Sequence, residues 1–305
     1  MNEKIICRVL TGPTASGKSE LAVRLAQEQG WEIICMDSMQ IYRGMDIGTA
    51  KPTPEEQRIV PHFMLDICDP TDIFSVSEYR DRAEKIILEE HARGRETLFV
   101  GGTVLYLQSM MHPMGMGNVP QNAELRSELN RKAETPEGRK ELHQVLERID
   151  PVTAGKLPVN DVRRVIRAIE VWEATGKPFS EQPERECDSG FRWKVVSTQM
   201  ARELLYMRIN SRVTKMIEMG LKKEVESLLN AGVPENAQSM NGIGYKEMIP
   251  CIQGEYSLEE AAEKIRLATR HYAKRQMTFL RREECIRYVR TDCDGSYDEI
   301  RQNLL

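Results

Sequence analysis

The stretch IICRVLTGPTASGKS, residues 5–19, decides the fold. Residues 5–10 form a short, mostly apolar run of the kind that becomes a buried strand, and a Gly/Ser-rich turn follows it. After the turn, Leu21, Leu25 and Ala26 fall on one face of an amphipathic run, which predicts a helix. This region therefore consists of a strand, a tight glycine-containing loop and a helix.

The loop between this strand and helix matches the pattern G-x-x-x-x-G-K-[ST] without a mismatch. Its glycines allow backbone N–H groups to turn toward phosphate oxygens, and the start of the helix adds positive potential. Lys18 adds a point charge, and the Ser19 hydroxyl is a candidate ligand for Mg²⁺. The pattern leaves open whether the ligand is a nucleoside triphosphate or a diphosphate. The residues predicted to bind phosphate are Gly12, Pro13, Thr14, Ala15, Ser16, Gly17, Lys18 and Ser19.

Further apolar strands alternate with amphipathic helices along most of the chain. This alternation predicts an α/β fold of the P-loop NTPase type, a parallel sheet flanked by helices on both faces. The expected later strands are residues 32–36, 63–67, 97–100, 193–198 and 286–290. Between residues 118 and 191 the pattern changes to charged helices broken by prolines, with no convincing strand. We therefore predict a P-loop core of residues 1–117 and 192–305, interrupted by an all-helical insertion of residues 118–191.

Two polar residues follow strands of this predicted sheet. Asp37 ends the strand at 32–36, and Thr103 follows the strand at 97–100 after two glycines. Because the carboxyl ends of parallel strands open onto the ligand crevice, Asp37 is expected near the phosphate loop. It is a candidate general base or magnesium partner, and Thr103 is a weaker candidate for the same site. The alternative is that both residues only cap the turn and the helix that follow them.

Composition and charge limit the class of protein. The chain has 305 residues, a net charge of −4 and seven scattered cysteines without a CxxC pair. Its five histidines show no ligand spacing, so we expect reduced thiols and no zinc site. The apolar run at residues 5–10 is too short for a signal peptide or a membrane span, and we expect a cytoplasmic protein without a membrane partner. Any site for nucleic acid must be a local basic patch.

Two such basic patches are evident. Arg163, Arg164 and Arg167 lie together on one side of an expected helix at 161–169, opposite its apolar face. Residues 270–282 contain five Lys or Arg residues and no acidic residue. Both patches suit a phosphate backbone, and in each case a solvated charged surface is the alternative interpretation.

Five longer segments occur in an informative order: GPTASGKS (12–19), DSMQIYRGMDIGTAKP (37–52), GGTVLY (101–106), NDVRRVIRAIEV (160–171) and ATRHYAKRQMTFLRR (268–282). Through them the sequence resembles the bacterial tRNA dimethylallyltransferases, also called tRNA isopentenyltransferases, over nearly its whole length. The resemblance implies transfer of the dimethylallyl group from dimethylallyl diphosphate to N6 of an adenosine next to the tRNA anticodon. The phosphate loop would hold the donor's diphosphate rather than ATP, which explains the missing second NTPase carboxylate after the strand at 97–100.

The same resemblance implies roles for individual residues. Asp37 is the general base, while Thr103 and Arg208 assist the departing diphosphate together with Lys18 and a Mg²⁺ ion held by Ser19. The target adenine is expected to leave its stack to reach Asp37, and Gln40 to read its edge. The residues implied in binding the anticodon arm of tRNA are Asp37, Ser38, Met39, Gln40, Thr103, Arg126, Arg163, Arg164, Val165, Ile166 and Arg167.

Two other classes of protein are alternatives. A P-loop kinase of a small metabolite would use Asp37 to deprotonate a hydroxyl group, but it has little use for the arginines at 163–167. A non-catalytic RNA-binding protein would leave the complete phosphate loop unexplained. We expect a protein of bacterial type, because eukaryotic relatives often add a C-terminal zinc finger and this chain ends at Leu305 without one. We also expect a monomer. Phe279 and Leu280 depart from the family pattern, which often has larger aromatic residues there.

Overall fold

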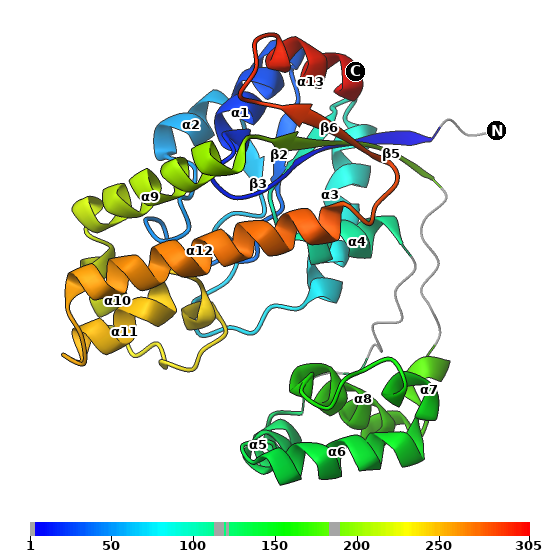
Figure 1. Cartoon of the computed structure of the whole chain (residues 1–305). Coiled ribbons are helices and arrows are strands. Elements are labelled where there is room, and N and C mark those ends of the chain that lie inside the picture. The colour runs from blue at the N-terminus through cyan, green and yellow to red at the C-terminus, as the bar shows by residue number, and fades with distance from the viewer. Residues whose placement is uncertain (1–3, 113–118, 120–121, 183–189) are drawn as a thin grey trace. The chain divides into compact units, whose positions relative to one another are not determined.

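The structure is a computed structural model, and it describes residues 4–112, 119, 122–182 and 190–305. The chain forms two compact units, which Figure 1 shows. The first comprises residues 1–111 and 188–305, and the second comprises residues 112–187. The boundary that the sequence predicts at 117/118 lies outside the described residues, and the one at 191/192 falls at the first residue of strand β5 (Phe191–Gln199).

Six parallel strands form the sheet of the first unit, in the order β3-β2-β4-β1-β5-β6. Apart from β5, they are β1 (Ile5–Thr11), β2 (Glu32–Cys35), β3 (His62–Phe63), β4 (Thr97–Val100) and β6 (Ile286–Arg290). The predicted α/β fold with a parallel sheet is therefore confirmed. In this order β1 and β4 lie at the centre of the sheet, so the phosphate loop after β1 lies beside the loop after β4.

The strand predicted at 63–67 is much shorter in the structure. β3 ends at Phe63, because Met64 and Asp66 have positive φ angles of 64° and 52°, which are incompatible with an extended strand. The backbone N–H of Ile67 then donates to the carbonyl of Ile41 at 2.8 Å. This segment therefore packs on the loop that follows Asp37 instead of lengthening the sheet.

Helices cover both faces of this sheet (Figure 1). Against one face, α1 (Lys18–Gln29) and α13 (Ser296–Leu304) enclose a core that includes Leu10 of β1. Cys7 and Val9 of the same strand point to the opposite face, the alternation of a strand that is buried on both sides. That second, larger core includes residues of α3 (Val76–Ala92), α4 (Val104–Met111), α9 (Arg202–Met219), α10 (Leu221–Asn230), α11 (Tyr245–Ile252) and α12 (Leu258–Leu280).

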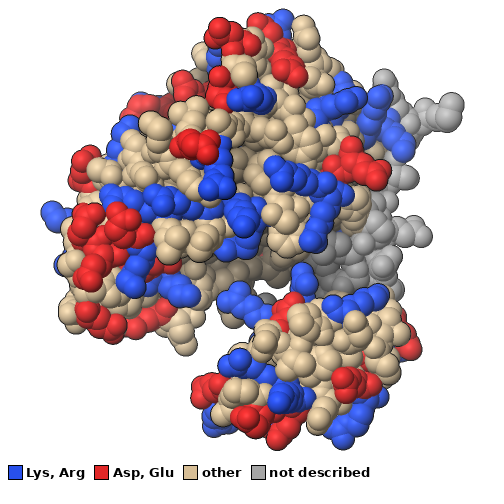
Figure 2. All heavy atoms as spheres, viewed as in Figure 1, with Lys and Arg blue, Asp and Glu red and all other residues tan. Residues whose placement is uncertain are grey.

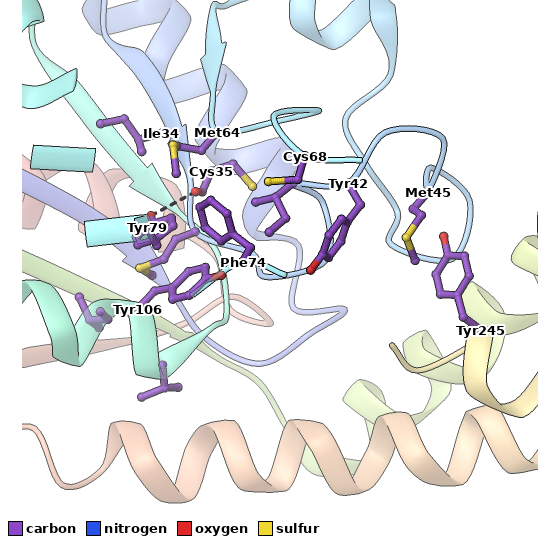
Figure 3. Close-up of a cluster of buried hydrophobic side chains, with 14 of the residues drawn as sticks. Ile34, Cys35, Tyr42, Met45, Met64, Cys68, Phe74, Tyr79, Tyr106 and Tyr245 are labelled. Atoms are coloured by element: carbon purple, nitrogen blue, oxygen red, sulfur yellow. Dashed lines mark hydrogen bonds between the residues drawn. The ribbon is translucent and has the colours of Figure 1, made fainter. Parts of the chain in front are cut away.

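Aromatic side chains of the larger core support the end of β2. Tyr79 of α3 and Tyr106 of α4 stack with their ring centroids 3.8 Å apart (Figure 3). The Tyr79 hydroxyl donates to the carbonyl of Cys35 at 3.1 Å. Because Cys35 is the last residue of β2, these contacts fix the strand end that leads to Asp37.

The described residues of the second unit form helices and no strand. The side chains of Asn122 and Thr135 cap the first two helices by accepting backbone N–H groups three residues ahead. Leu146 and Ile169 belong to a hydrophobic core that is the unit's own. The helices are α5 (Ala123–Lys132), α6 (Pro136–Ile149), α7 (Pro151–Ala154) and α8 (Val162–Thr175), followed by a 3₁₀ turn at Phe179–Glu181.

Val165 and Ile166 form part of this core. Their exposed fractions are 1% and 3%, since the period of the helix places them on the inner face of α8. Their side chains therefore pack inside the unit, and a tRNA contact at these two positions stays a prediction. Arg163 and Arg164 lie on the exposed face of the same helix.

Candidate active site

A cavity of about 780 Å³ opens beside the phosphate loop of the first unit. Its walls come from the loops after β1, β2 and β4, from residues 46–57, and from α9 and α12. The carboxyl ends of parallel strands are the expected place for such a cavity. The polar residues discussed below that line it are Thr14, Ser19, Lys18, Asp37, Gln40, Arg208, Arg212, Lys215, Tyr272 and Gln276.

The phosphate loop is closed by contacts within itself and with β5. The Lys18 ammonium donates to the Pro13 carbonyl at 2.7 Å and to the Ser16 hydroxyl at 3.5 Å. Gly12 has a φ of 134°, and a Cβ atom there would lie 2.2 Å from the Thr198 hydroxyl, so only glycine fits. The stretch from Thr14 to Ser19 lines the cavity, while Gly12 and Pro13 form the base of the loop.

Lys18 lies in an unfavourable environment for its positive charge. Burial and the nearby Arg212 guanidinium lower the pKa of Lys18 to about 7, although the Asp37 carboxylate opposes this shift. Without a ligand, the cavity therefore favours the neutral amine of Lys18 more than water does. A bound phosphate group would supply the missing negative charge.

Asp37 faces the same cavity. Its Oδ1 atom accepts the backbone N–H groups of Met39 at 2.8 Å and Gln40 at 3.3 Å, so one oxygen caps the following turn. Burial raises the pKa of Asp37, while these two N–H groups and the positive charges of Lys18 and Arg212 oppose the shift. A carboxylate with a raised pKa is a stronger base than one in water, which suits proton abstraction. The turn-capping and cavity-facing roles thus coexist in one side chain.

Thr103 supports the loop that carries Asp37. Its hydroxyl accepts the backbone N–H of Ser38 at 3.0 Å and lies 3.4 Å from the Ser38 hydroxyl. Its own backbone N–H donates to the Met36 carbonyl at 3.2 Å. The structure thus brings Thr103 directly to the Asp37 loop, as the strand order predicts.

Three basic residues of α9 line the cavity, at i, i+4 and i+7. Arg208 lies over the phosphate loop, because its Nη2 atom is 3.3 Å from the position of a Cβ atom on Gly17. Arg212 donates from Nη1 to the Thr14 hydroxyl at 3.3 Å, and Lys215 follows on the same face. Burial and the neighbouring Arg208 lower the pKa of Arg212. Arg208 was identified from the sequence, but Arg212 was not. The signal for Arg212 was its position four residues after Arg208 in LYMRINSRV (205–213), which places both on one face of a helix.

Gln40 lines the cavity, but its amide group is already engaged. Nε2 donates to the carbonyls of Thr49 at 3.1 Å and Ala50 at 3.2 Å. Oε1 accepts the Cys35 thiol at 3.1 Å. Reading a base edge would compete with these hydrogen bonds, so the role of Gln40 as a reader of adenine stays a prediction.

The arginines of the second unit that are predicted to contact RNA differ in their exposure. Arg126 and Arg167 are largely shielded and form ion pairs with Glu170 at 2.8 Å and 2.6 Å. Arg163 and Arg164 are exposed, and among the described residues Arg164 forms one long ion pair, of 3.5 Å, with Asp161. The two exposed arginines are therefore the stronger candidates for phosphate contacts.

The described residues contain no group of three or more His, Cys, Asp or Glu side chains that would hold a metal ion alone. Mg²⁺ commonly binds through one or two protein oxygens together with phosphates and water, and such a site does not require a cluster. Ser19 is exposed at the cavity and Asp37 faces it, so both fit this kind of ligand set. Within the described residues, none of the helices combines the length and apolar character needed to span a bilayer.

A parallel α/β sheet with a phosphate loop, a partly buried carboxylate and a row of cations around one cavity defines a P-loop protein with a site suited to a phosphorylated ligand. Many protein families share that description, so the family must come from comparison with known proteins. The chain belongs to the IPP transferase family, whose model matches residues 40–283.

Two tRNA dimethylallyltransferases are examples of relatives that resemble the chain over nearly its full length. A tRNA dimethylallyltransferase of Pelotomaculum thermopropionicum is 45% identical, covering 98% of this chain and 96% of the relative. One from Caldanaerobacter subterraneus subsp. tengcongensis is 43% identical, with coverages of 97% and 95%.

Two solved structures are similar as well. The tRNA isopentenylpyrophosphate transferase of Bacillus halodurans is 39% identical with a TM-score of 0.71, covering 99% of this chain and 95% of that one. A eukaryotic dimethylallyltransferase acting on tRNA is 27% identical with a TM-score of 0.78, with coverages of 98% and 78%. Prenyl-group transferases of this kind generally use a divalent metal ion.

Proposed function

We propose that the chain is a tRNA dimethylallyltransferase. It transfers the dimethylallyl group of dimethylallyl diphosphate to N6 of the adenosine on the 3′ side of the anticodon and releases diphosphate. One observation carries this proposal: in a member of the IPP transferase family, a phosphate loop and a partly buried Asp37 line the same cavity. An enzyme that transfers a group from a diphosphate to an amine needs both features within reach of one substrate pair.

The diphosphate of the donor lies on the phosphate loop. Backbone N–H groups of the loop and the start of α1 hold its oxygens, and Lys18 adds positive charge. Arg208 and Arg212 approach from α9 and stabilise the negative charge that builds on the leaving group. Such preorganised charges commonly contribute several kcal/mol to a transition state, about 2.7–4 kcal/mol for a single donor.

Asp37 acts as the general base. The N6 nitrogen attacks the allylic carbon of the donor, a new N–C bond forms, and the C–O bond to diphosphate breaks. The proton leaves N6 for the Asp37 carboxylate, whose raised pKa favours its uptake. Thr103 keeps the Asp37 loop in place through Ser38.

Ser19 is the residue that would hold Mg²⁺ at this site, with diphosphate oxygens and water as further ligands. The ion would neutralise part of the charge on the leaving diphosphate. The protein's own contribution is to place a hydroxyl group at the first turn of α1, directly after Lys18.

The tRNA side of the proposal rests on exposed basic residues. Arg163 and Arg164 of the second unit, supported by Arg126 and Arg167, suit the phosphates of an anticodon arm. Figure 2 shows Lys and Arg side chains over α12. Exposed basic residues near its end include Lys274 and Arg275 of the helix and Arg281 and Arg282 directly after it. The adenine leaves its stack to enter the cavity. We further propose that the protein works as a monomer in the cytoplasm.

A transfer assay tests the proposal. Purified protein is mixed with radiolabelled dimethylallyl diphosphate, Mg²⁺ and unmodified tRNA, and in parallel with ATP. We expect label in tRNA from the prenyl donor, a loss of at least about 100-fold in Asp37→Asn, and full activity in Asp298→Asn, an exposed residue of α13. ATP turnover without transfer to tRNA would instead establish the P-loop kinase alternative.

A further inference from the structure

Gln276 of α12 connects two loops of the active site. Its side chain is buried, with an exposed fraction of 4%. Its Oε1 atom accepts the backbone N–H of Thr14 at 2.9 Å, and its Nε2 atom donates to the Gly102 carbonyl at 2.8 Å. One amide group therefore ties the phosphate loop to the loop after β4, two segments that sequence reasoning treated separately.

The fit around this amide is tight. A Cβ atom on Gly102 would lie 2.1 Å from Nε2 of Gln276, so the backbone can approach the amide only because residue 102 is glycine. Tyr272, one turn earlier on α12, interacts through its hydroxyl with both Thr103 and Gln276. Only a side chain that both donates and accepts can satisfy Thr14 and Gly102 together, and an uncharged amide does so without adding charge.

The contact has consequences for the bound phosphate. Because the Thr14 N–H points to Gln276, it is not available to a phosphate oxygen, unlike the loop N–H groups expected to face the ligand. Arg212 holds the side chain of the same threonine at 3.3 Å. Gln276 and Arg212 therefore hold the phosphate loop at Thr14. The other end of the Gln276 amide binds Gly102, which directly precedes Thr103, the residue that supports the Asp37 loop.

We propose that Gln276 is a positioning residue for the transfer reaction. It sets the position of the phosphate loop, and hence of the donor's leaving group, relative to the loop that carries Asp37. This inference rests on the proposed function, since it concerns the geometry of the same site. Displacing a reacting group by about 1 Å can cost roughly 100-fold in rate, so a single hydrogen-bonded link at this point is significant.

The first test replaces the amide by an apolar side chain of similar size. Gln276→Met removes both hydrogen bonds. Gln108→Met is the matched control, because the Gln108 amide also donates a hydrogen bond, at 2.8 Å to Glu283 just after α12, but lies away from the phosphate loop. We expect the KM for dimethylallyl diphosphate to rise, or kcat to fall, by about 10- to 100-fold in Gln276→Met, with the KM for tRNA within twofold of the wild type. The control should keep all three constants.

Hydrogen exchange measured by mass spectrometry reports the position of the loop without any turnover. In Gln276→Met the peptide that contains Thr14 should exchange about tenfold faster or more, whereas peptides from the second unit stay unchanged. A purely structural role would instead lower the midpoint of thermal unfolding and raise exchange throughout the first unit.

Gln276→Glu supplies a rescue experiment. A protonated carboxyl group can accept from Thr14 and donate to Gly102, as the amide does, whereas a carboxylate repels the Gly102 carbonyl and the diphosphate. The activity of Gln276→Glu relative to wild type should therefore rise as the pH is lowered. Taking the ratio removes the pH dependence of those groups that titrate alike in the two proteins.

The outcomes separate this inference from the proposed function. If the wild type transfers no dimethylallyl group, the proposed function fails, and exchange at Thr14 still decides whether Gln276 holds the loop. If the wild type is active but Gln276→Met behaves like Gln108→Met, or affects the KM for tRNA instead of the donor, the inference is overturned. A ratio for Gln276→Glu that does not change with pH also contradicts it.

Discussion

Arg126 binds Glu170 through two hydrogen bonds, from Nε to Oε1 and from Nη2 to Oε2, both 2.8 Å long. Glu170 is 1% exposed and also accepts Nη1 of Arg167 at 2.6 Å and the backbone N–H of Asn122 at 2.7 Å. Burial alone would raise the pKa of Glu170, but the hydrogen bonds from Arg126 and Arg167 hold it below its usual value. Two arginines that were expected to contact RNA are thus also part of the internal structure of the second unit.

Glu170→Ala is expected to destabilise the second unit by about 2–4 kcal/mol, because it removes a buried carboxylate that Arg126, Arg167 and the Asn122 N–H all contact. Glu141→Ala is the control. It breaks an exposed ion pair of 3.0 Å with Lys132 and should cost less than about 1 kcal/mol. Denaturant unfolding, monitored by hydrogen exchange in residues 122–182, measures the loss of stability in both variants. Equal effects of the two substitutions would show that the Glu170 contacts contribute little.

The same carboxylate predicts a dependence on pH. Since the pKa of Glu170 is lower in the folded than in the unfolded protein, its stabilisation is present above the unfolded pKa of about 4.3. It is lost as the pH falls through the lower folded value. Unfolding of the second unit below about pH 4 should therefore be less steep in Glu170→Gln than in the wild type, which parallel acid titrations followed by circular dichroism would measure. An unchanged acid transition would contradict this.

Lys18 predicts the pH dependence of donor binding. Its pKa in the free protein is about 7, and a bound diphosphate must raise that pKa because it adds negative charge beside the ammonium. The contribution of Lys18 to affinity is then complete below about pH 7 and is lost as the pH rises through the higher pKa of the complex. Calorimetry in two buffers of different ionisation enthalpy should detect proton uptake on binding diphosphate at pH 8. Lys18→Met should abolish the uptake, and uptake that persists in it would assign the proton to another group.

Glu224 of α10 holds a segment of the cavity wall in place. Its carboxylate accepts three successive backbone N–H groups, those of Asp46 at 3.0 Å, Ile47 at 2.8 Å and Gly48 at 3.1 Å. It also accepts the Tyr245 hydroxyl at 2.6 Å. Successive N–H groups around one carboxylate form a strong anion site, which here is occupied by a side chain of the protein.

Glu224→Ala should therefore increase hydrogen exchange in residues 46–50 and cost about 2–3 kcal/mol in the free energy of unfolding. Tyr245→Phe removes one of the four hydrogen bonds and should cost about 1 kcal/mol, with little change in exchange at 46–50. If Tyr245→Phe loosens these residues as much as Glu224→Ala does, the tyrosine rather than the carboxylate holds the loop.

The sequence predicts those parts of the site that depend on neighbouring residues. The phosphate loop is one such part, because its pattern, the strand before it and the helix after it lie within 25 consecutive residues, 5–29. Asp37 and Thr103 follow from the rule that parallel strands end at one edge of the sheet. Gln276 could not be found in this way, because 262 residues separate it from Thr14 and only the packing of α12 brings them together.

Local patterns also mislead where backbone or burial changes the outcome. The apolar run at 63–67 predicts a strand, but the positive φ of Met64 ends it. The resemblance includes Val165 and Ile166 in a stretch implied to bind tRNA, but in the structure their side chains lie on the inner face of α8 and form part of the unit's core. In the same stretch Arg167 forms an ion pair with the buried Glu170. The charge pattern alone cannot distinguish such a paired arginine from an exposed one.

Arg212 predicts opposite effects on stability and function. It is a partly buried cation beside Lys18 and Arg208, and its hydrogen bond to the Thr14 hydroxyl does not neutralise its charge. Arg212→Met should therefore leave the ligand-free protein as stable as the wild type or more stable by about 1 kcal/mol. The same substitution should raise the KM for dimethylallyl diphosphate by about 10- to 100-fold, because a positive charge near the leaving group is lost.

Arg212→Met should also raise the pKa of Lys18 above its value of about 7, since Arg212 is one of the two causes that lower it. Three measurements separate these effects. Thermal unfolding without ligand measures stability, and steady-state kinetics measures the KM. The pH at which diphosphate binding takes up a proton reports the pKa of Lys18. A clear fall in the midpoint of thermal unfolding would show that Arg212 serves mainly to hold Thr14. A higher KM together with an unchanged or higher midpoint would show that the protein tolerates electrostatic strain in the empty cavity in order to bind the diphosphate.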